Sequence, residues 1–185
     1  MVLKKTNPEP LTMADPYGAA IPIKNAGIVL LSTYIPMLFD RLGLTDGASF
    51  KSTKHQLDAP HYVQYLASGL NHAAEDLQPL NKVLCGLPLS QPLSGDIEIS
   101  AENKQLVNSL INAAIGYWPS IGATSIDGFR GNWLVRDGLL KQHPDKWELI
   151  VERRAYDILI HKSPFSFSII KYPWMDKPLH VVWPF

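Results

Sequence analysis

The hydropathy changes period at residues 147–152, Trp147-Glu148-Leu149-Ile150-Val151-Glu152. The first, third and fifth side chains of this stretch are large and apolar, and they alternate with Glu148, Ile150 and Glu152. A period of two residues is typical of a β-strand with one buried face. We therefore expect a half-buried strand here.

Other strand patterns lie on both sides of this stretch. Residues 133–136 with Leu139 and Leu140, joined by a turn at Gly138, are expected to form the partner arm. Residues 165–170 alternate apolar and polar side chains, and residues 179–183 form a last short strand. The segment Ile21-Pro22-Ile23 is compatible with an edge strand, where proline is tolerated.

The region before residue 133 has helical periods. A mostly apolar helix is expected from a cap at Asn25 to a stop at Gly43, divided near Ile35 by Pro36. Further helices are expected over residues 59–70, with Pro60 in the first turn, over 80–84, closed by Gly86, and over 126–134, leading into a strand. Residues 45–53 are read as a loop.

A longer helix is expected to begin at Ser100 and to end before Pro119. Its apolar residues recur at the spacing of one helix face. They are Leu106, Leu110, Ala113 and Tyr117.

These patterns predict an α+β fold, because helices come first and strands later. We expect helices in the N-terminal two-thirds to pack with a small antiparallel sheet formed mainly from the C-terminal third. Residues 1–20 hold three prolines and are expected to be an extended arm or linker. Residues 21–185 are expected to form a single domain, since 185 residues suffice for one good-sized core.

Composition argues against two classes of partner. Lys plus Arg equals Asp plus Glu, so the chain lacks the basic excess of most nucleic-acid binders. The longest apolar stretch, residues 26–39, is too short and interrupted to span a bilayer. We therefore expect neither nucleic-acid binding nor direct membrane insertion.

The sequence lacks several common catalytic and metal-binding motifs. The sequence has no glycine-rich phosphate loop, no G-x-S-x-G and no H-E-x-x-H. His55 and His61 flank Asp58 but lack metal-ligand spacing, and we expect them to face solvent around a helix start. Cys85 lies among apolar residues and is expected to be an unreactive core thiol. We predict no catalytic, metal or cofactor-binding residues.

The densest charged cluster consists of Glu152, Arg153, Arg154 and Asp157. It fits either a catalytic carboxylate held by arginines or a structural ion-pair network. We favour the network, because arginine makes bidentate contacts with carboxylates in structural roles.

Aromatic residues gather at the C-terminus among three prolines. They fit two roles, since aromatics both cover sheets and anchor protein partners. The candidate interface residues are Tyr172, Trp174, Met175, Trp183 and Phe185.

Six stretches resemble, in order, the motifs of one family. They are residues 22–31 (I-x-N-A-G-L-V-L-L), 34–44 (L-P-x-L-F-x-x-L-G-L), 80–88 (L-N-K-L-L-C-G), 117–130 (x-W-P-x-L-x-x-T-S-x-x-G-L-R), 152–157 (E-R-x-x-x-D) and 169–175 (I-x-x-P-W-M). Between about residues 21 and 183 the chain thus resembles the contractile injection system tape measure proteins of phage-tail-like particles.

The resemblance implies a non-enzymatic structural part without a cofactor. It implies a role in inner-tube assembly or length control, with partners among the inner tube, the cap or terminator and the spike or baseplate. It also implies assembly in the cytoplasm, then residence in an extracellular or cell-anchored particle; a homo-oligomeric ring is possible by analogy. The chain lacks a long polar or heptad helix, so we expect an excised domain or a short relative that plugs, caps or adapts one end of the tube.

Two alternatives stay open at this point. The chain could be an adaptor or chaperone that binds a partner protein through the C-terminal aromatics. It could also be a hydrolase that uses His61, Asp58 or Cys85.

Overall fold

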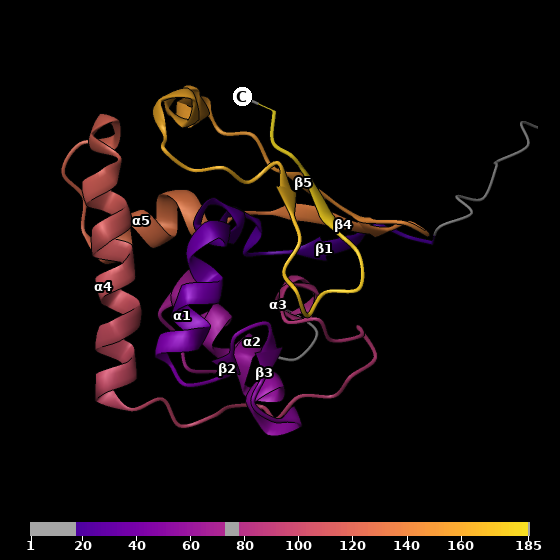
Figure 1. The fold of residues 1–185 in the computed structure, drawn as a ribbon. Helices are drawn as coiled ribbons and strands as arrows, with labels where there is room; N and C mark the ends of the chain where they lie inside the picture. The colour runs from indigo at the N-terminus through magenta and orange to yellow at the C-terminus, as the bar shows by residue number, and fades with distance from the viewer. Residues whose placement is uncertain (1–17, 73–77, 185) are drawn as a thin grey trace, which may run out of the picture.

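The computed structural model describes residues 18–72 and 78–184. The fold is α+β, as predicted, and most of the helices precede most of the strands (Figure 1). Most of the expected arm over residues 1–20, and Phe185, lie outside the described residues.

One five-stranded sheet organises the C-terminal part of the chain. Its strands are β1 (Ile21–Ile23), β4 (Gly138–Gln142), β5 (Trp147–Val151), β6 (Ile169–Ile170) and β7 (Leu179–Val182), in the spatial order β1-β4-β5-β7-β6. The prediction of an edge strand at Pro22 is confirmed. Proline suits this place because it has no N–H to donate to a further strand.

The sheet is mixed: it is antiparallel, as expected, except at one pair of strands. Strand β5 pairs with β7 in parallel, while the other neighbours are antiparallel. Parallel strands need a crossover connection, which a hairpin cannot supply. The chain makes this crossover through the 3-10 helix η5 (Ala155–Lys162) and β6.

Two expected strands are shorter than their patterns indicate. Trp133 and Leu134 end the π-helix η4 (Arg130–Leu134), and the strand begins only at Gly138. Phe165 and Phe167 are buried but lie outside any strand, so only the end of residues 165–170 joins the sheet. In both places bulky side chains fill the core from backbone that lies outside the sheet.

The helical part contains α-helices and turns of 3-10 helix. Its elements are η1 (Ala26–Tyr34), α1 (Ile35–Arg41), α2 (Thr53–Ser68), α3 (Pro79–Leu84), α4 (Ala101–Tyr117), η3 (Pro119–Ile121) and α5 (Ile126–Phe129). A two-stranded hairpin of β2 (Thr45–Asp46) and β3 (Ser49–Phe50) replaces part of the loop expected over residues 45–53.

The first apolar helix divides where Pro36 predicts. The 3-10 helix η1 gives way to α1 at Ile35, and Gly43 follows α1 with a φ of 74°. Asn25 stands at the N-cap position, as expected, but its side chain makes no capping hydrogen bond. Its Nδ2 instead donates to Asn81 Oδ1 on α3 at 2.7 Å.

Helix α2 begins six residues earlier than its apolar pattern indicates. Ser52 caps it by accepting a hydrogen bond from the backbone N–H of His55. Pro60 therefore lies inside the helix, which corrects its predicted place in the first turn. Other boundaries agree with the sequence, because Ser100 caps α4 and Gly86 follows α3 with a φ of 69°.

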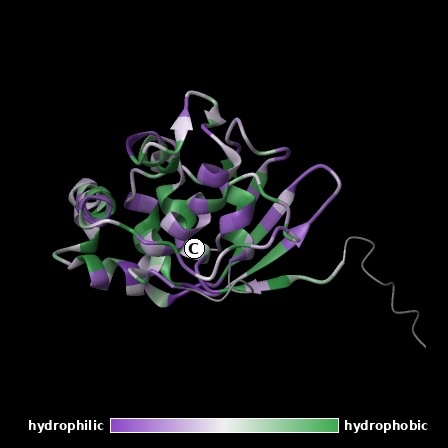
Figure 2. Cartoon of the chain, turned by 90° about the horizontal axis from the view of Figure 1, so that it is seen from below, coloured by the Kyte–Doolittle hydropathy of each residue, from purple (hydrophilic) through white to green (hydrophobic). Residues whose placement is uncertain are grey.

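The core lies between the sheet and the helices. Helices α1, α2 and α3 lie on one side of the sheet, and α4 stands at the far end of the molecule (Figure 1). Residues 26–32 of η1 are buried. Much of the ribbon at the centre of the molecule is green, that is, hydrophobic (Figure 2). Gly27 allows η1 to meet η4, since a Cβ there would overlap the carbonyl oxygen of Trp133.

Candidate functional site

A buried ion pair joins the region before β4 to the 3-10 helix η5. Arg136 Nη1 lies 2.6 Å from each carboxylate oxygen of Asp157, and the two side chains are 0% and 1% exposed. Arg136 Nη2 also donates to the carbonyl of Asn132 at 2.8 Å. The pair therefore holds the chain on both sides of the β4–β5 hairpin.

Asp157 is also the meeting point of two further hydrogen bonds. Its Oδ2 accepts from Trp183 Nε1 and from the backbone N–H of Arg154, each at 2.9 Å. Burial alone would raise the pKa of Asp157, but these donors together with Arg136 outweigh it and lower the pKa. The carboxylate is thus charged and fully engaged in holding β7 and η5 together.

Three aromatic rings surround the guanidinium group of Arg136. The Cζ atom lies 4.8 Å from the ring centre of Trp183 and 5.6 Å from those of Trp133 and Tyr156. Such contacts are favourable cation–π interactions, particularly when the cation is desolvated. The cluster is packed with side chains of this chain, which fits a structural role better than a substrate site.

In the predicted charged cluster, Arg154 contacts Glu152 through its side chain and Asp157 through its backbone N–H. Glu152 Oε2 and Arg154 Nε lie 3.4 Å apart near the surface, and Arg153 is exposed. Asp157 is buried beside Arg136, which sequence reasoning missed. The available signal was a charged residue, Arg136, directly after the bulky apolar residues 133–135.

The C-terminal aromatics make contacts within the chain. The hydroxyl of Tyr172 donates to the carbonyl of Ser32, and Trp174 Nε1 donates to the carbonyl of Leu84 at 2.9 Å. Met175 and Trp183 are buried as well. These side chains cover the core here, and their use as anchors for a partner stays a prediction.

The residues considered for catalysis do not converge. His61 is 1% exposed, so its expected position facing solvent was wrong. The earlier start of α2 places it in the middle of a buried helix face. His55 contacts Ser52 Oγ, and Asp58 pairs with Lys54 at 2.6 Å.

The two remaining side chains considered for catalysis, His61 and Cys85, are both buried. Neither ring nitrogen of His61 has a hydrogen-bond partner among the described residues, and burial lowers the pKa of His61. Cys85 is fully buried, and burial raises the pKa of its thiol well above the usual value. Within residues 18–72 and 78–184, no three His, Cys, Asp or Glu side chains group as metal ligands.

The outer face of the sheet carries an apolar row that crosses four strands. The register places Pro22 beside Leu139, Leu139 beside Ile150, and Ile150 beside Val182. Leu139 and Val182 are 41% and 46% exposed. The next residues along the strands point inward, so this row is the face that the helices do not cover.

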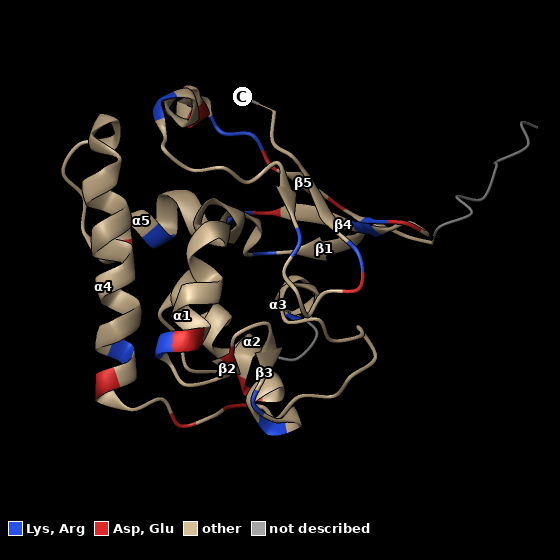
Figure 3. Ribbon diagram, in the orientation of Figure 1, with Lys and Arg blue, Asp and Glu red and all other residues tan. Residues whose placement is uncertain are grey.

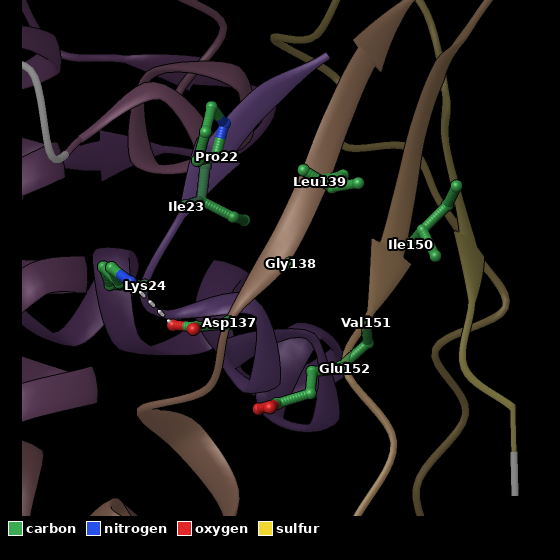
Figure 4. Close-up of a pocket in the computed structure, with 9 residues that line it drawn as sticks. All are labelled: Pro22, Ile23, Lys24, Asp137, Gly138, Leu139, Ile150, Val151 and Glu152. Carbon is green, nitrogen blue, oxygen red and sulfur yellow. Dashed lines mark ion pairs between the residues drawn. The ribbon is translucent and has the colours of Figure 1, made fainter.

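A shallow hollow of about 300 Å³ opens over the part of this row formed by Pro22, Leu139 and Ile150 (Figure 4). Its rim carries the ion pair of Lys24 and Asp137, whose Nζ and Oδ1 atoms lie 3.1 Å apart, together with Glu152. An apolar floor with a charged rim is the anatomy of a protein interface. We call the row Pro22, Leu139, Ile150 and Val182, with this rim, the outer sheet face; it is the candidate functional site.

A comparison with known protein families gives a match over nearly the whole chain. Residues 3–183 match the model of the family described as contractile injection system tape measure protein. Searches of curated proteins and of solved structures found no significant match. None of the helices in the described part of the chain is long and apolar enough to cross a membrane. The match covers nearly the whole chain, so this protein belongs to the contractile injection system tape measure protein family.

Proposed function

We propose that this protein is a non-enzymatic structural part of a contractile injection system that joins neighbouring subunits through its outer sheet face. The observation that carries the proposal is the apolar row across four strands, left uncovered by the helices. Exposed contiguous apolar surface is costly in water and marks interaction sites. Its neighbours are subunits of the inner tube, the cap or terminator, or the spike or baseplate.

The lengths of the helices favour a plug or adaptor over a ruler. The longest described helix, α4, has 17 residues and is only about 26 Å long at ~1.5 Å per residue. A ruler sets the length of a tube by its own extended length, whereas a packed domain marks one place along it. We therefore assign the described domain to one end of the inner tube.

The charged and aromatic clusters support a role without turnover. Catalytic groups need access to a substrate and a partner that tunes their proton affinity. Here the Asp157 carboxylate binds the side chains of Arg136 and Trp183. Cys85 is buried in the core. The contacts of these side chains therefore stabilise the fold.

The proposal is tested by placing a charge on the apolar row. A chain carrying Leu139→Glu and Val182→Glu is produced in place of the natural chain, and its amount in purified particles is measured by quantitative mass spectrometry. Burying two unpaired carboxylates in an interface is unfavourable, so we expect the altered chain to be missing from particles. Thermal unfolding of the purified chain checks that the fold is kept.

Ile158→Glu is the matched control. Ile158 lies on η5, outside the sheet, and is 69% exposed. The chain that carries Ile158→Glu should therefore enter particles normally. Equal incorporation of the doubly substituted chain and this control would refute an interface on the outer sheet face.

A further inference from the structure

A second apolar surface lies on the opposite side of the core, between α1 and α4. A groove of about 420 Å³ separates these helices. Met37 of α1 is 43% exposed and Tyr117 of α4 is 64% exposed along it. This groove shares no residue with the outer sheet face.

Helix α4 has two adjacent apolar stripes, and the chain buries one of them fully and the other in part. The buried stripe consists of Val107, Ile111 and Ala114. The second stripe, predicted from the sequence as one helix face, consists of Leu106, Leu110, Ala113 and Tyr117, and all four line the groove. Leu106 and Leu110 are half-buried and pack against the core, whereas Ala113 and Tyr117 are exposed. The groove therefore lies beside apolar surface of α4 that the core does not cover completely.

The exposed side of α4 is also unusually poor in charge. From Gln105 to Tyr117 the helix has no charged residue, although Ser109, Asn112 and Gly116 are exposed (Figure 3). Surface helices normally carry charged residues on their solvent side. Depletion of charge is instead a feature of the core of protein interfaces.

A single positive charge defines one end of the groove. Arg41, in the last turn of α1, is the charged residue among those that line it. It is exposed and forms no ion pair with any residue in the described ranges. A partner that places a carboxylate here would gain complementary charge and a bidentate contact.

We propose that the groove between α1 and α4 binds an amphipathic helix of a partner subunit that carries an acidic residue against Arg41. The stripe recurs at intervals of three and four residues, so its ridges match the grooves of a second helix. Leu106 and Tyr117 are eleven residues apart and span about 16 Å, which is roughly three turns of a docked helix.

Two synthetic peptides test the proposal. Both are fluorescently labelled helices with leucines at the spacing of the α4 stripe and neutral polar residues elsewhere. One carries a glutamate at the flank of its apolar side and the other a lysine. Fluorescence anisotropy should show that the glutamate peptide binds the full chain at least about tenfold more tightly, because like charges at an interface repel. Arg41→Glu should reverse this preference.

Matched variants establish where the peptide binds. Ala113→Trp fills the groove with an uncharged ring and should abolish binding, while Asn112→Trp, on the adjacent exposed position, should leave it unchanged. Equal binding of the two peptides, or binding that survives Ala113→Trp, would overturn the proposal. So would a dimer of the free chain in light scattering that Ala113→Trp converts to a monomer, because the occupant would then be a second copy. Since the groove and the outer sheet face share no residue, failure here leaves the proposed function standing.

Discussion

Arg136 and Asp157 form a buried ion pair, with one guanidinium nitrogen 2.6 Å from both carboxylate oxygens. The two residues are 21 positions apart, on opposite sides of the β4–β5 hairpin. Trp183 attaches the last strand to the same carboxylate. One ion pair thus connects three segments of the C-terminal part of the chain.

Removal of one partner of this pair should be strongly destabilising. Arg136→Met leaves the Asp157 carboxylate buried without its main counter-charge, so we expect a loss of about 3–5 kcal/mol in the free energy of unfolding. Chemical denaturation of the purified chain measures this. The control is Lys24→Met, which breaks an ion pair with side chains 63% and 59% exposed and should cost at most about 1 kcal/mol. Similar losses for both variants would show that burial of the Arg136 pair contributes little.

His61 should make the protein less stable in mild acid. Burial lowers its pKa below the usual value of 6.5, so the unfolded chain binds a proton more readily than the folded chain. Stability is then fully present above the unfolded pKa and falls as the pH drops below it. His61→Leu should reduce the fall in melting temperature between about pH 7 and pH 5.

The control for this prediction is His55→Leu. His55 lies at the exposed start of α2, and this change should leave the pH dependence largely intact. A His61→Leu chain that keeps the full pH dependence would assign the effect to other groups.

Two glycines should respond in opposite ways to alanine. A Cβ at Gly27 would overlap the carbonyl of Trp133, so Gly27→Ala must separate η1 from η4 and lower the melting temperature. Gly116 lies in α4 with open space around it, and Gly116→Ala should stabilise the protein by about 0.5–1 kcal/mol through helix propensity. Thermal unfolding of the two variants checks this, and equal effects would contradict the close approach at Gly27.

Cys85 should be unreactive in the folded protein. Burial raises its thiol pKa and blocks access, so thiolate-dependent alkylation should be negligible until the chain unfolds. Iodoacetamide labelling followed by mass spectrometry, with and without denaturant, measures the difference. Fast labelling of the native chain would show that the region around α3 opens readily.

Local patterns predicted much of the fold. The alternation at Trp147, Leu149 and Val151 is that of strand β5, whose three apolar side chains are buried. Pro36 marks the change from η1 to α1, and Gly43 and Gly86 follow helices with positive φ. These features could be predicted from the sequence because each depends on a few neighbouring residues.

Features that depend on contacts between residues far apart in the chain could not be predicted from the sequence. Arg136 follows an apolar run, and the sequence pattern places it in a strand. In the structure its side chain is buried because it pairs with Asp157. The start of α2 was missed because Thr53 and Lys54 look like loop residues, while Ser52 and the Lys54–Asp58 pair stabilise a helix there. The parallel pairing of β5 and β7 depends on the path of the connection between them, which hydropathy does not encode.

The most direct test of the central claim is a cryo-EM reconstruction of intact particles that contain this chain. We predict density for its five-stranded sheet at one end of the inner tube, with Leu139 and Val182 covered by a neighbouring subunit. Particles that assemble normally and lack the chain, or a bound chain whose outer sheet face is open to solvent, would contradict the account.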